Sequence, residues 1–236
     1  ARQQATKEGA RIVSMPGISR AVFESGGMTA DYNALQREIS SMRTVFRRKR
    51  RVRVKTQTGT DVEFLTGGRW VLEDNGICNR PQQVSNLPAG KVFVLPKEGT
   101  MSGRIVIDGS WQGDLLSDPV SFQVENGIVV DVSGGTLADE IKSLYEQAKE
   151  GIRSTKRDLA WTVAEFGFGM NPKATYLIGN KVEDLVVRGS AYFGFGDNTH
   201  IGGKARVGIH QRGVMRSPEV SLEEITLLSE GKLSFR

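Results

Sequence analysis

The first thirty residues predict a short helix followed by a single strand. Ala1 to Gly9 is a polar run of helix formers, and the β-branched run Arg11 to Met15 then ends at Pro16-Gly17. Helix, glycine and strand in this order form the second half of an α/β unit, and no first strand precedes them. We therefore expect residues 1–30 to be the remnant of an α/β unit from a missing N-terminal domain, and residues 31–236 to form a β-rich domain.

An apolar stripe predicts the first long helix. Thr29 or Asp31 can cap it, because both side chains accept hydrogen bonds from free backbone N–H groups. Apolar residues then recur at spacings of three and four, at Tyr32, Leu35, Ile39, Met42 and Phe46. Such a stripe is typical either of a helix packed on a sheet or of a dimerisation seam. We prefer the packed helix, because the stripe is short for a coiled coil.

Beyond this helix the apolar pattern changes to a period of two, which indicates strands. Turns at Thr58–Asp61 and at Asn126-Gly127 predict two hairpins. The expected strands are Val52–Lys55, Val62–Phe64, Arg69–Leu72, Lys91–Leu95, Gly103–Ile107, Pro119–Val124, Gly127–Val132, Leu159–Phe166, Ser190–Phe195 and Lys204–Gly208. A second long helix, capped by Thr136, reaches about Glu150. The predicted fold is α+β, with a mostly antiparallel, curved or barrel-like β core and two main helices.

Composition indicates an ordinary globular protein. Apolar residues make up 38% of the chain and charged residues 25%. No run approaches the roughly 20 apolar residues of a membrane span, and the N-terminus has no signal-peptide pattern. The single cysteine, Cys78, excludes an internal disulfide and fits a reducing compartment. We expect a cytoplasmic protein without a membrane partner, and we interpret Cys78 as a packed or half-exposed thiol.

The net charge of +5 comes largely from one basic run. Arg47 to Arg51, followed by Arg53 and Lys55, places seven cations in nine residues. Such a run can bind nucleic acid, but no aromatic platform or recognised motif accompanies it. We interpret it as a solvated helix C-terminus, where cations complement the helix dipole, and expect no nucleic-acid partner.

Both histidines of the chain lie in the glycine-rich run from Glu165 to Arg212. On residue type alone, Glu165, Asp197, His200 and His210 are candidate ligands for a borderline cation such as zinc, cobalt or iron. Their spacing matches no compact metal motif such as HExxH. Asp197 and Asn198 follow a strand after glycine, and we favour a turn that they stabilise over contact with a ligand.

Several segments in one collinear order resemble the metallo-aminopeptidases of the aminopeptidase T and aminopeptidase S type. The segments are NLPAGKVFVLP at Asn86–Pro96, AEFGFGMNPKA at Ala164–Ala174, GNKVEDLVVRGSAYFGFGDN at Gly179–Asn198 and GGKARVGIHQRGVM at Gly202–Met215. The resemblance implies an aminopeptidase T-like fold, a leucyl aminopeptidase-like metallohydrolase activity and an oligomer, usually a homodimer. A ring-cleaving branch of the same fold, the dihydroxypyridine dioxygenases, is implied to use mononuclear iron.

Carried over residue by residue, the implied metal site is altered. The family's first glutamate ligand falls on Lys91, its first histidine on Tyr192 and its last acidic residue on Arg212, while Glu165 and His210 keep their types. Lys91 and Arg212 would repel a divalent cation by roughly 4 kcal/mol per pair of unit charges at 4 Å. If that alignment is shifted, His200 substitutes for the missing histidine.

Our leading expectation is therefore a divergent aminopeptidase-family protein with a metal-free or metal-poor pocket and no cofactor. In it His210, Glu165, Lys91 and Tyr192 are catalytic candidates. Arg212 and Lys91, with Asp197 and Asn198, bind an anionic or carboxylate-bearing small molecule or peptide. One alternative is an active metallo-aminopeptidase, or the iron-dependent ring-cleaving branch, with metal on Glu165, His200, His210 and Asp197. The other is a non-enzymatic scaffold or partner subunit.

Overall fold

The computed structural model describes residues 2–47, 49–67 and 71–234. The helices are α1 (Arg2–Lys7), α2 (Arg20–Glu24), α3 (Tyr32–Val45) and α4 (Gly135–Glu150), with 3-10 helices η1 (Gly26–Thr29), η2 (Ser154–Trp161) and η3 (Thr199–Ile201). The strands are β1 (Ile12–Ser14), β2 (Arg51–Lys55), β3 (Asp61–Leu65), β4 (Leu72–Asp74), β5 (Val84–Asn86), β6 (Lys91–Val94), β7 (Ser102–Ile107), β8 (Ser110–Trp111), β9 (Asp114–Leu115), β10 (Val120–Glu125), β11 (Ile128–Ser133), β12 (Val163–Gly169), β13 (Ala191–Gly196), β14 (His210–Met215), β15 (Glu219–Leu222), β16 (Ile225–Ser229) and β17 (Lys232–Leu233).

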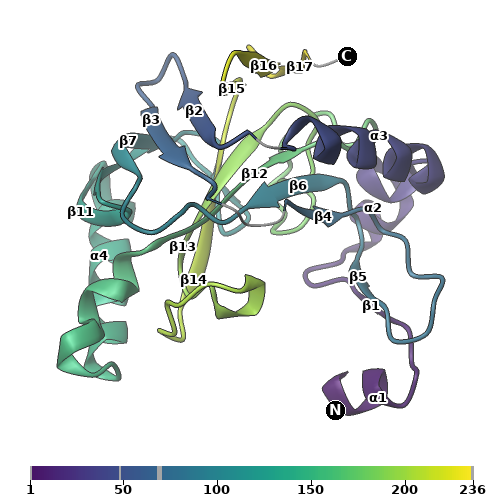
Figure 1. The fold of residues 1–236 in the computed structure, drawn as a ribbon, viewed down its shortest axis with the longest axis horizontal. Coiled ribbons are helices and arrows are strands. Elements are labelled where there is room, and N and C mark those ends of the chain that lie inside the picture. The colour runs from purple at the N-terminus through teal and green to yellow at the C-terminus, as the bar shows by residue number, and fades with distance from the viewer. Residues whose placement is uncertain (1, 48, 68–70, 235–236) are drawn as a thin grey trace.

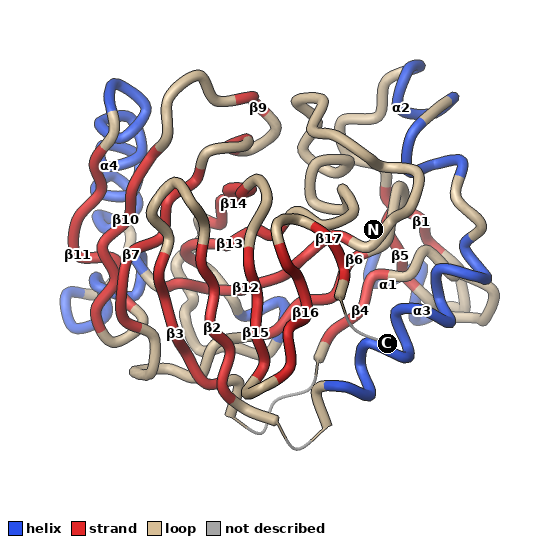
Figure 2. Tube along the Cα trace, turned by 90° about the horizontal axis from the view of Figure 1, so that it is seen from above, coloured by secondary structure: helices blue, strands red, loops and turns tan. Residues whose placement is uncertain are grey.

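Two large antiparallel sheets form the body of the described structure. One has the order β11-β10-β7-β3-β2-β15-β16-β17, and the other has the order β4-β6-β12-β13-β14-β8-β9. Figure 2 shows β12 and β13 running across β3, β2 and β15, so the two sheets cross rather than align. A separate pair, β1 and β5, is parallel. Together with the two long helices, this confirms the predicted α+β fold with a mostly antiparallel core.

Aromatic side chains fill the space between the two sheets. Phe64 on β3 meets Phe166 on β12 with ring centroids 5.5 Å apart, and Phe122 on β10 stacks on Phe195 on β13 at 4.4 Å. All four rings are almost fully buried, and each contributes about 2–3 kcal/mol by leaving water. Because side chains alternate along a strand, the other face of β12 and β13 is free to carry polar groups.

The two long helices lie at opposite ends of the molecule (Figure 1). Asp31 caps α3 by accepting from the backbone N–H groups of Asn33 and Ala34, both at 3.0 Å. Leu35, Ile39 and Met42 are buried in the main core, which confirms the helix packed on a sheet. The predicted cap of α4 is wrong: the helix begins at Gly135 after Gly134, so Thr136 lies inside its first turn.

One predicted strand is right only at its end, and another is wrong. The end of the predicted strand at 159–166 is strand β12, but its beginning belongs to η2, where Trp161 stacks on Tyr145 with centroids 4.4 Å apart. Residues 204–208 form no strand either. There the backbone N–H groups of Ala205 and Val207 donate to the side chains of Asn198 and Asp197 instead of to a neighbouring strand. Hydrogen bonds to nearby side chains take the place of the backbone hydrogen bonds of a β-ladder.

The basic run follows α3 and continues into a strand. The helix ends at Val45, before the run begins at Arg47, and β2 begins at Arg51. Only the first residues of the run therefore lie next to the helix C-terminus, and none of its described residues is part of the helix. On β2, Arg53 forms an ion pair with Asp61 at 3.1 Å on the neighbouring strand β3. Arg48 lies outside the described residues, as do the first two residues of the strand predicted at Arg69–Leu72. The separate α/β unit at residues 1–30 stays a prediction.

Candidate metal centre

One face of the seven-stranded sheet carries a row of polar side chains. Strand register places Glu165 opposite Gly194 on β13, and Gly194 opposite Arg212 on β14. Directly opposed residues point to the same face of a sheet, so Glu165 and Arg212 share it. His210 lies two residues before Arg212 and therefore points the same way. Gly194 has no side chain, and this leaves room for the carboxylate and the imidazole between the strands.

Glu165 is the centre of this row. It is 1% exposed, and its Oε1 accepts a hydrogen bond from Nε of Arg212 and lies 3.3 Å from Nε2 of His210. Burial by itself would raise the pKa of Glu165, but the Arg212 guanidinium and His210 outweigh burial and lower this pKa to about 2. The other carboxylate oxygen, Oε2, is buried and has no hydrogen-bond partner among the described residues. Glu165 is thus a buried anion with one oxygen to offer.

The hydrogen bonds of His210 decide which of its ring nitrogens can bind a metal ion. Its Nδ1 lies 2.7 Å from the backbone carbonyl of Asp197, and a carbonyl can only accept, so Nδ1 carries the proton. In the neutral imidazole, Nε2 is then an acceptor that faces Oε1 of Glu165. A proton on Nε2 joins the two groups as an ion pair, and a metal ion bound by both would take the place of that proton. A backbone carbonyl that fixes the histidine tautomer in this way is the usual partner of a metal-binding imidazole.

His200 completes a cluster of three candidate ligands. It lies on η3, and its ring is 5.1 Å from that of His210, centroid to centroid, in an edge-to-face arrangement. Partial burial and the proximity of His210 lower the pKa of His200, which keeps the imidazole neutral, as a metal ligand must be. One ligand atom from each of Glu165, His200 and His210 can be chosen so that all three lie within 4.8 Å of one another. The donor set fits a divalent transition metal.

Asp197 and Asn198 are turn residues, not ligands. The carboxylate of Asp197 accepts from the backbone N–H groups of Thr199, Val207 and Gly208 and from the hydroxyl of Thr199. Asn198 likewise accepts from the backbone of Ala205 at 2.9 Å. Asp197 therefore has no free oxygen for a metal, and the cluster does not include it. Its backbone carbonyl nevertheless orients His210, so the turn positions the site.

Asp197→Asn should destabilise the metal-free protein in a pH-dependent way. Its hydrogen bonds outweigh burial and lower the pKa of Asp197 to about 2. Because the folded pKa lies below the unfolded value, the stabilisation is fully present above about pH 4 and is lost as the pH falls toward 2. Because solvent screens this partly exposed carboxylate, we expect a loss of about 1 kcal/mol near neutral pH and almost none near pH 2. Urea unfolding of both proteins across this range measures the difference, and a constant difference would contradict the assignment.

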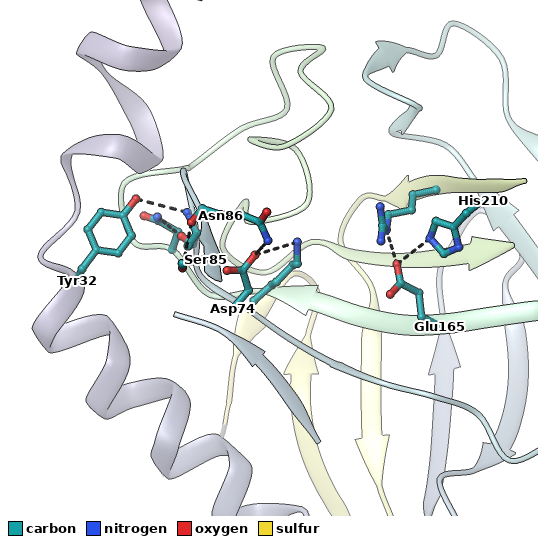
Figure 3. A network of polar contacts seen from close by, with 10 residues as sticks. Tyr32, Asp74, Ser85, Asn86, Glu165 and His210 are labelled. Atoms are coloured by element: carbon teal, nitrogen blue, oxygen red, sulfur yellow. Dashed lines mark hydrogen bonds and ion pairs between the residues drawn. The ribbon is translucent and has the colours of Figure 1, made fainter. Parts of the chain in front are cut away.

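Lys91 is not beside Glu165. Its Nζ forms an ion pair with Asp74 at 3.3 Å, and the Asp74 carboxylate also accepts from Nδ2 of Asn86 at 3.0 Å. Figure 3 shows the group of Asp74 and Asn86 apart from that of Glu165 and His210. Lys91 lies opposite Gly169 on β12, four residues from Glu165, which is roughly 13 Å along the strand. Strands are spaced about 4.8 Å apart, so β14 with Arg212 lies roughly 14 Å from β6 across the sheet. The structure brings Arg212 to Glu165, as the sequence led us to expect, but it gives Lys91 a partner that sequence reasoning missed.

Tyr192 lies on the same face as Glu165, two residues before Gly194. The ring is fully buried, and the hydroxyl has no hydrogen-bond partner among the residues that the structure describes. Burial, followed by the nearby Glu165 carboxylate, raises the pKa of Tyr192 well above its ordinary value. The hydroxyl is therefore neutral at all physiological pH values. It can donate a hydrogen bond, but as a neutral phenol it is a poor metal ligand.

Gly194→Ala should damage the centre without removing any ligand. A Cβ there would lie 2.6 Å from Cγ of Glu165 and 3.0 Å from Cε1 of His210, so both side chains must move. We expect a loss of about 1–3 kcal/mol in stability, because the strands cannot separate, together with weaker binding of Co²⁺. Gly151→Ala is the control, since its Cβ would meet its first neighbour at an ordinary 3.9 Å. Equal Co²⁺ affinity in the two variants would contradict the expectation.

Comparison with known proteins identifies the family. The family model described as "NicX: 2,5-dihydroxypyridine 5,6-dioxygenase" matches residues 1–235. The chain belongs to this family. A curated relative, the 2,5-dihydroxypyridine 5,6-dioxygenase of Pseudomonas putida, is 19% identical over 83% of the chain. The chain spans 57% of the length of that relative.

Solved structures agree at the level of the fold. The 2,5-dihydroxypyridine dioxygenase of Pseudomonas putida KT2440 matches the whole chain with a TM-score of 0.85 and 19% identity, and the chain covers 68% of it. AmpT from Thermus thermophilus matches 86% of the chain with a TM-score of 0.64 and 15% identity, and 55% of that protein is covered. The resemblance to aminopeptidase T therefore holds for the fold, which this dioxygenase family shares.

Two predictions are wrong in the light of this family. The prediction of a hydrolase of the metallopeptidase type is wrong, because the matching family model and the curated relative are dioxygenases. The expectation of no cofactor is also overturned. Dioxygenases of the NicX type depend on iron, and the fold brings Glu165, His200 and His210 together. The physical reason for the error is that the turn at Asp197 brings His200, eight residues beyond Tyr192, back to the site.

In the described part of the chain, no helix is long and apolar enough to cross a membrane.

Proposed function

We propose that this chain supplies the metal site of a dioxygenase that cleaves the ring of a hydroxylated pyridine. The observation that carries the proposal is the convergence of Glu165, His200 and His210 within 4.8 Å. Two histidines and one carboxylate are the ligand set of many non-haem Fe(II) oxygenases, in which the remaining coordination positions stay open. Membership of the 2,5-dihydroxypyridine 5,6-dioxygenase family supports the same class of reaction.

The charge and orientation of the three side chains already suit the binding of such an ion. Glu165 is ionised and buried, and it has an oxygen without a partner among the described residues. The Asp197 carbonyl holds His210 in the tautomer that exposes Nε2. His200 is the exposed member of the set and therefore lies at the solvent side of the site. When bound, ferrous iron would supply the one-electron chemistry by which dioxygen reacts with an electron-rich ring.

Arg212 is suited to orient an anionic substrate. Its Nε donates to Glu165, and no other hydrogen bond of its guanidinium is found among the described residues. Its side chain is 29% exposed, so solvent reaches part of the side chain. The hydroxyl groups of a dihydroxypyridine are acidic, and a guanidinium fork binds a deprotonated oxygen strongly. Arg212 would hold such an oxygen beside the ligands, while it also fixes the position of Glu165.

Lys91 and Tyr192 serve the deeper part of the same face in this proposal. Tyr192 has a neutral hydroxyl that can donate to a substrate oxygen or ring nitrogen. Lys91 is buried against Asp74 and contributes no free charge, because the pair is close to neutral. Its role is therefore to shape the far wall of the site rather than to act as a nucleophile.

The test is metal loading followed by oxygen uptake. Metal-free protein is titrated anaerobically with Fe²⁺, and the stoichiometry is measured by elemental analysis after desalting. Dioxygen consumption is then followed with 2,5-dihydroxypyridine and with unsubstituted pyridine as the control substrate. The proposal expects one iron per chain and uptake with the dihydroxylated ring alone. Absence of stoichiometric iron, or uptake that does not depend on the hydroxyl groups, would overturn it.

A further inference from the structure

A small polar cavity lies directly behind Arg212. Three segments enclose it: β14 with Arg212 and Val214, the turn between β8 and β9, and the turn around Asp184. The enclosure is tight, since a Cβ on Gly113 would lie 2.6 Å from the backbone nitrogen of Lys181. The space open to the centre of a water molecule is about 10 Å³, which is close to the minimum for one buried water.

Three buried polar atoms without partners belong to residues that line this cavity. They are Oγ of Ser110, Oε1 of Gln112 and Oδ2 of Asp184, and none has a hydrogen-bond partner among the described residues. Ser110 and Asp184 are each 1% exposed. Buried polar groups in folded proteins are almost always hydrogen-bonded, and leaving one unpaired costs about 1–3 kcal/mol. Three such atoms on residues that line one cavity point to a shared polar partner.

Gln112 is held at the cavity in an unfavourable backbone conformation. Its φ is +54°, in the left-handed region, at the turn between β8 and β9. Asparagine or glycine is the usual residue at such a position. The side chain of Gln112 is directed by a hydrogen bond from Nε2 to the carbonyl of His210 at 3.5 Å, which leaves Oε1 for the cavity. The strained turn thus delivers an acceptor to a site next to the metal ligands.

Asp184 offers the charged atom of the three. Its Oδ1 accepts from the backbone N–H of Ile178 at 2.9 Å, which fixes the carboxylate, and Oδ2 remains. We propose that an ordered water occupies the cavity and links Asp184 to the guanidinium of Arg212, which makes Asp184 a positioning residue for Arg212. The water accepts from Arg212 and donates to Asp184 and to Gln112, and Ser110 can serve as a further donor.

This link offsets the positive charge that Arg212 places beside the metal ligands. This step of the inference rests on the proposed function. Arg212 neutralises much of the charge that Glu165 would offer to a divalent cation. A carboxylate behind Arg212 returns one negative charge to the group. Lys181 also lines the cavity, but it is exposed and solvent screens its charge. The inner groups Glu165, Arg212 and Asp184 therefore carry a net charge of about −1. It also anchors the guanidinium from its far side. Without Asp184, the positive charge of Arg212 would not be offset beside the metal, and its guanidinium would be held less firmly.

The first test needs no metal. A high-resolution crystal structure of the metal-free wild-type chain should show a water within hydrogen-bonding distance of both Asp184 and Arg212. A dry cavity would overturn the proposal whatever the metal site does. If the water is present and the chain binds no metal at all, the proposed function fails and the link stands.

The second test measures Co²⁺ affinity by competition with a chromophoric chelator. Asp184→Asn keeps the oxygen that accepts from Ile178 and removes the charge, and it should weaken binding about tenfold, as changes behind a metal ligand do. Glu183→Gln is the matched control, because Glu183 is equally buried but bonds to the backbone of Gly27 at 2.7 Å. In an Arg212→Gln background the Asp184→Asn effect should vanish. Equal affinities of Asp184→Asn and wild type would overturn the positioning role.

Discussion

Glu165→Gln is expected to abolish stoichiometric metal binding. The substitution keeps the shape of the side chain and removes the one buried carboxylate among the three candidate ligands. Changes behind a ligand already weaken metal affinity 10- to 100-fold, so loss of the charged ligand itself should weaken Co²⁺ or Fe²⁺ binding at least about 100-fold. Ring cleavage should fall with it. Competition titration with a chromophoric chelator measures the affinity directly.

The same substitution should also lower stability, because it breaks a buried pair. Arg212 loses its carboxylate partner, and removing one member of a buried ion pair costs about 3 kcal/mol or more. Urea unfolding of the metal-free proteins measures this loss. Glu183→Gln again serves as the control, since it removes another buried glutamate that lies outside the cluster. Metal binding by Glu165→Gln at wild-type affinity would exclude this carboxylate from the centre.

Arg212→Gln should move stability and metal affinity in opposite directions. Without metal, the buried Glu165 carboxylate would lose its principal cation, and the free energy of unfolding should fall by about 3 kcal/mol. In the metal-bound protein, the substitution removes a positive charge that competes with the metal ion for Glu165. Two unit charges 4 Å apart interact by roughly 4 kcal/mol at an effective dielectric of 20, and a third of that is already tenfold in affinity. We therefore expect Co²⁺ to bind at least about ten times more tightly.

The matched control for this variant is Arg188→Gln. Arg188 pairs with Glu38 at 2.6 Å and is about as exposed as Arg212, but it lies outside the cluster of ligands. Its replacement should lower stability without a gain in Co²⁺ affinity. Unfolding in the presence and absence of saturating Co²⁺ separates the two effects. A fall in metal affinity on Arg212→Gln would mean that Arg212 supports the ion rather than opposes it. Steady-state oxygen uptake should show a raised KM for the dihydroxylated ring, because the substrate clamp is lost.

The sequence located part of the site because residue type limits the chemistry. Glu165, His210 and Arg212 lie together, and each was singled out from one glycine-rich run. The turn role of Asp197 and Asn198 was also predictable, because short polar side chains after a strand bond to their own backbone. Asp74 and Asp184 were not found. Their positions beside Lys91 and behind Arg212 depend on strand register and on the packing of a distant turn, which leave no periodic signal.

The fold was predictable where local patterns are strong. The hairpin at Asn126-Gly127 formed as expected, with both residues at positive φ, since a two-residue turn of this kind fixes its own geometry. The strand expected at residues 204–208 failed for the opposite reason. Its apolar alternation competed with hydrogen bonds to Asp197 and Asn198, and those bonds depend on a chain reversal that the pattern does not encode.

The sequence by itself determined the two long helices, many of the strands, the antiparallel α+β class and the residue types available for chemistry. These depend on short-range physics: side-chain periodicity, turn conformations and the charge of each group. Only the tertiary structure decided which groups meet. It places His200 beside Glu165 and His210, and it pairs Lys91 with Asp74. Contacts between residues far apart in the chain depend on how strands are ordered and which face each presents, and a change of one residue in register would have moved Glu165 from this polar face into the aromatic core.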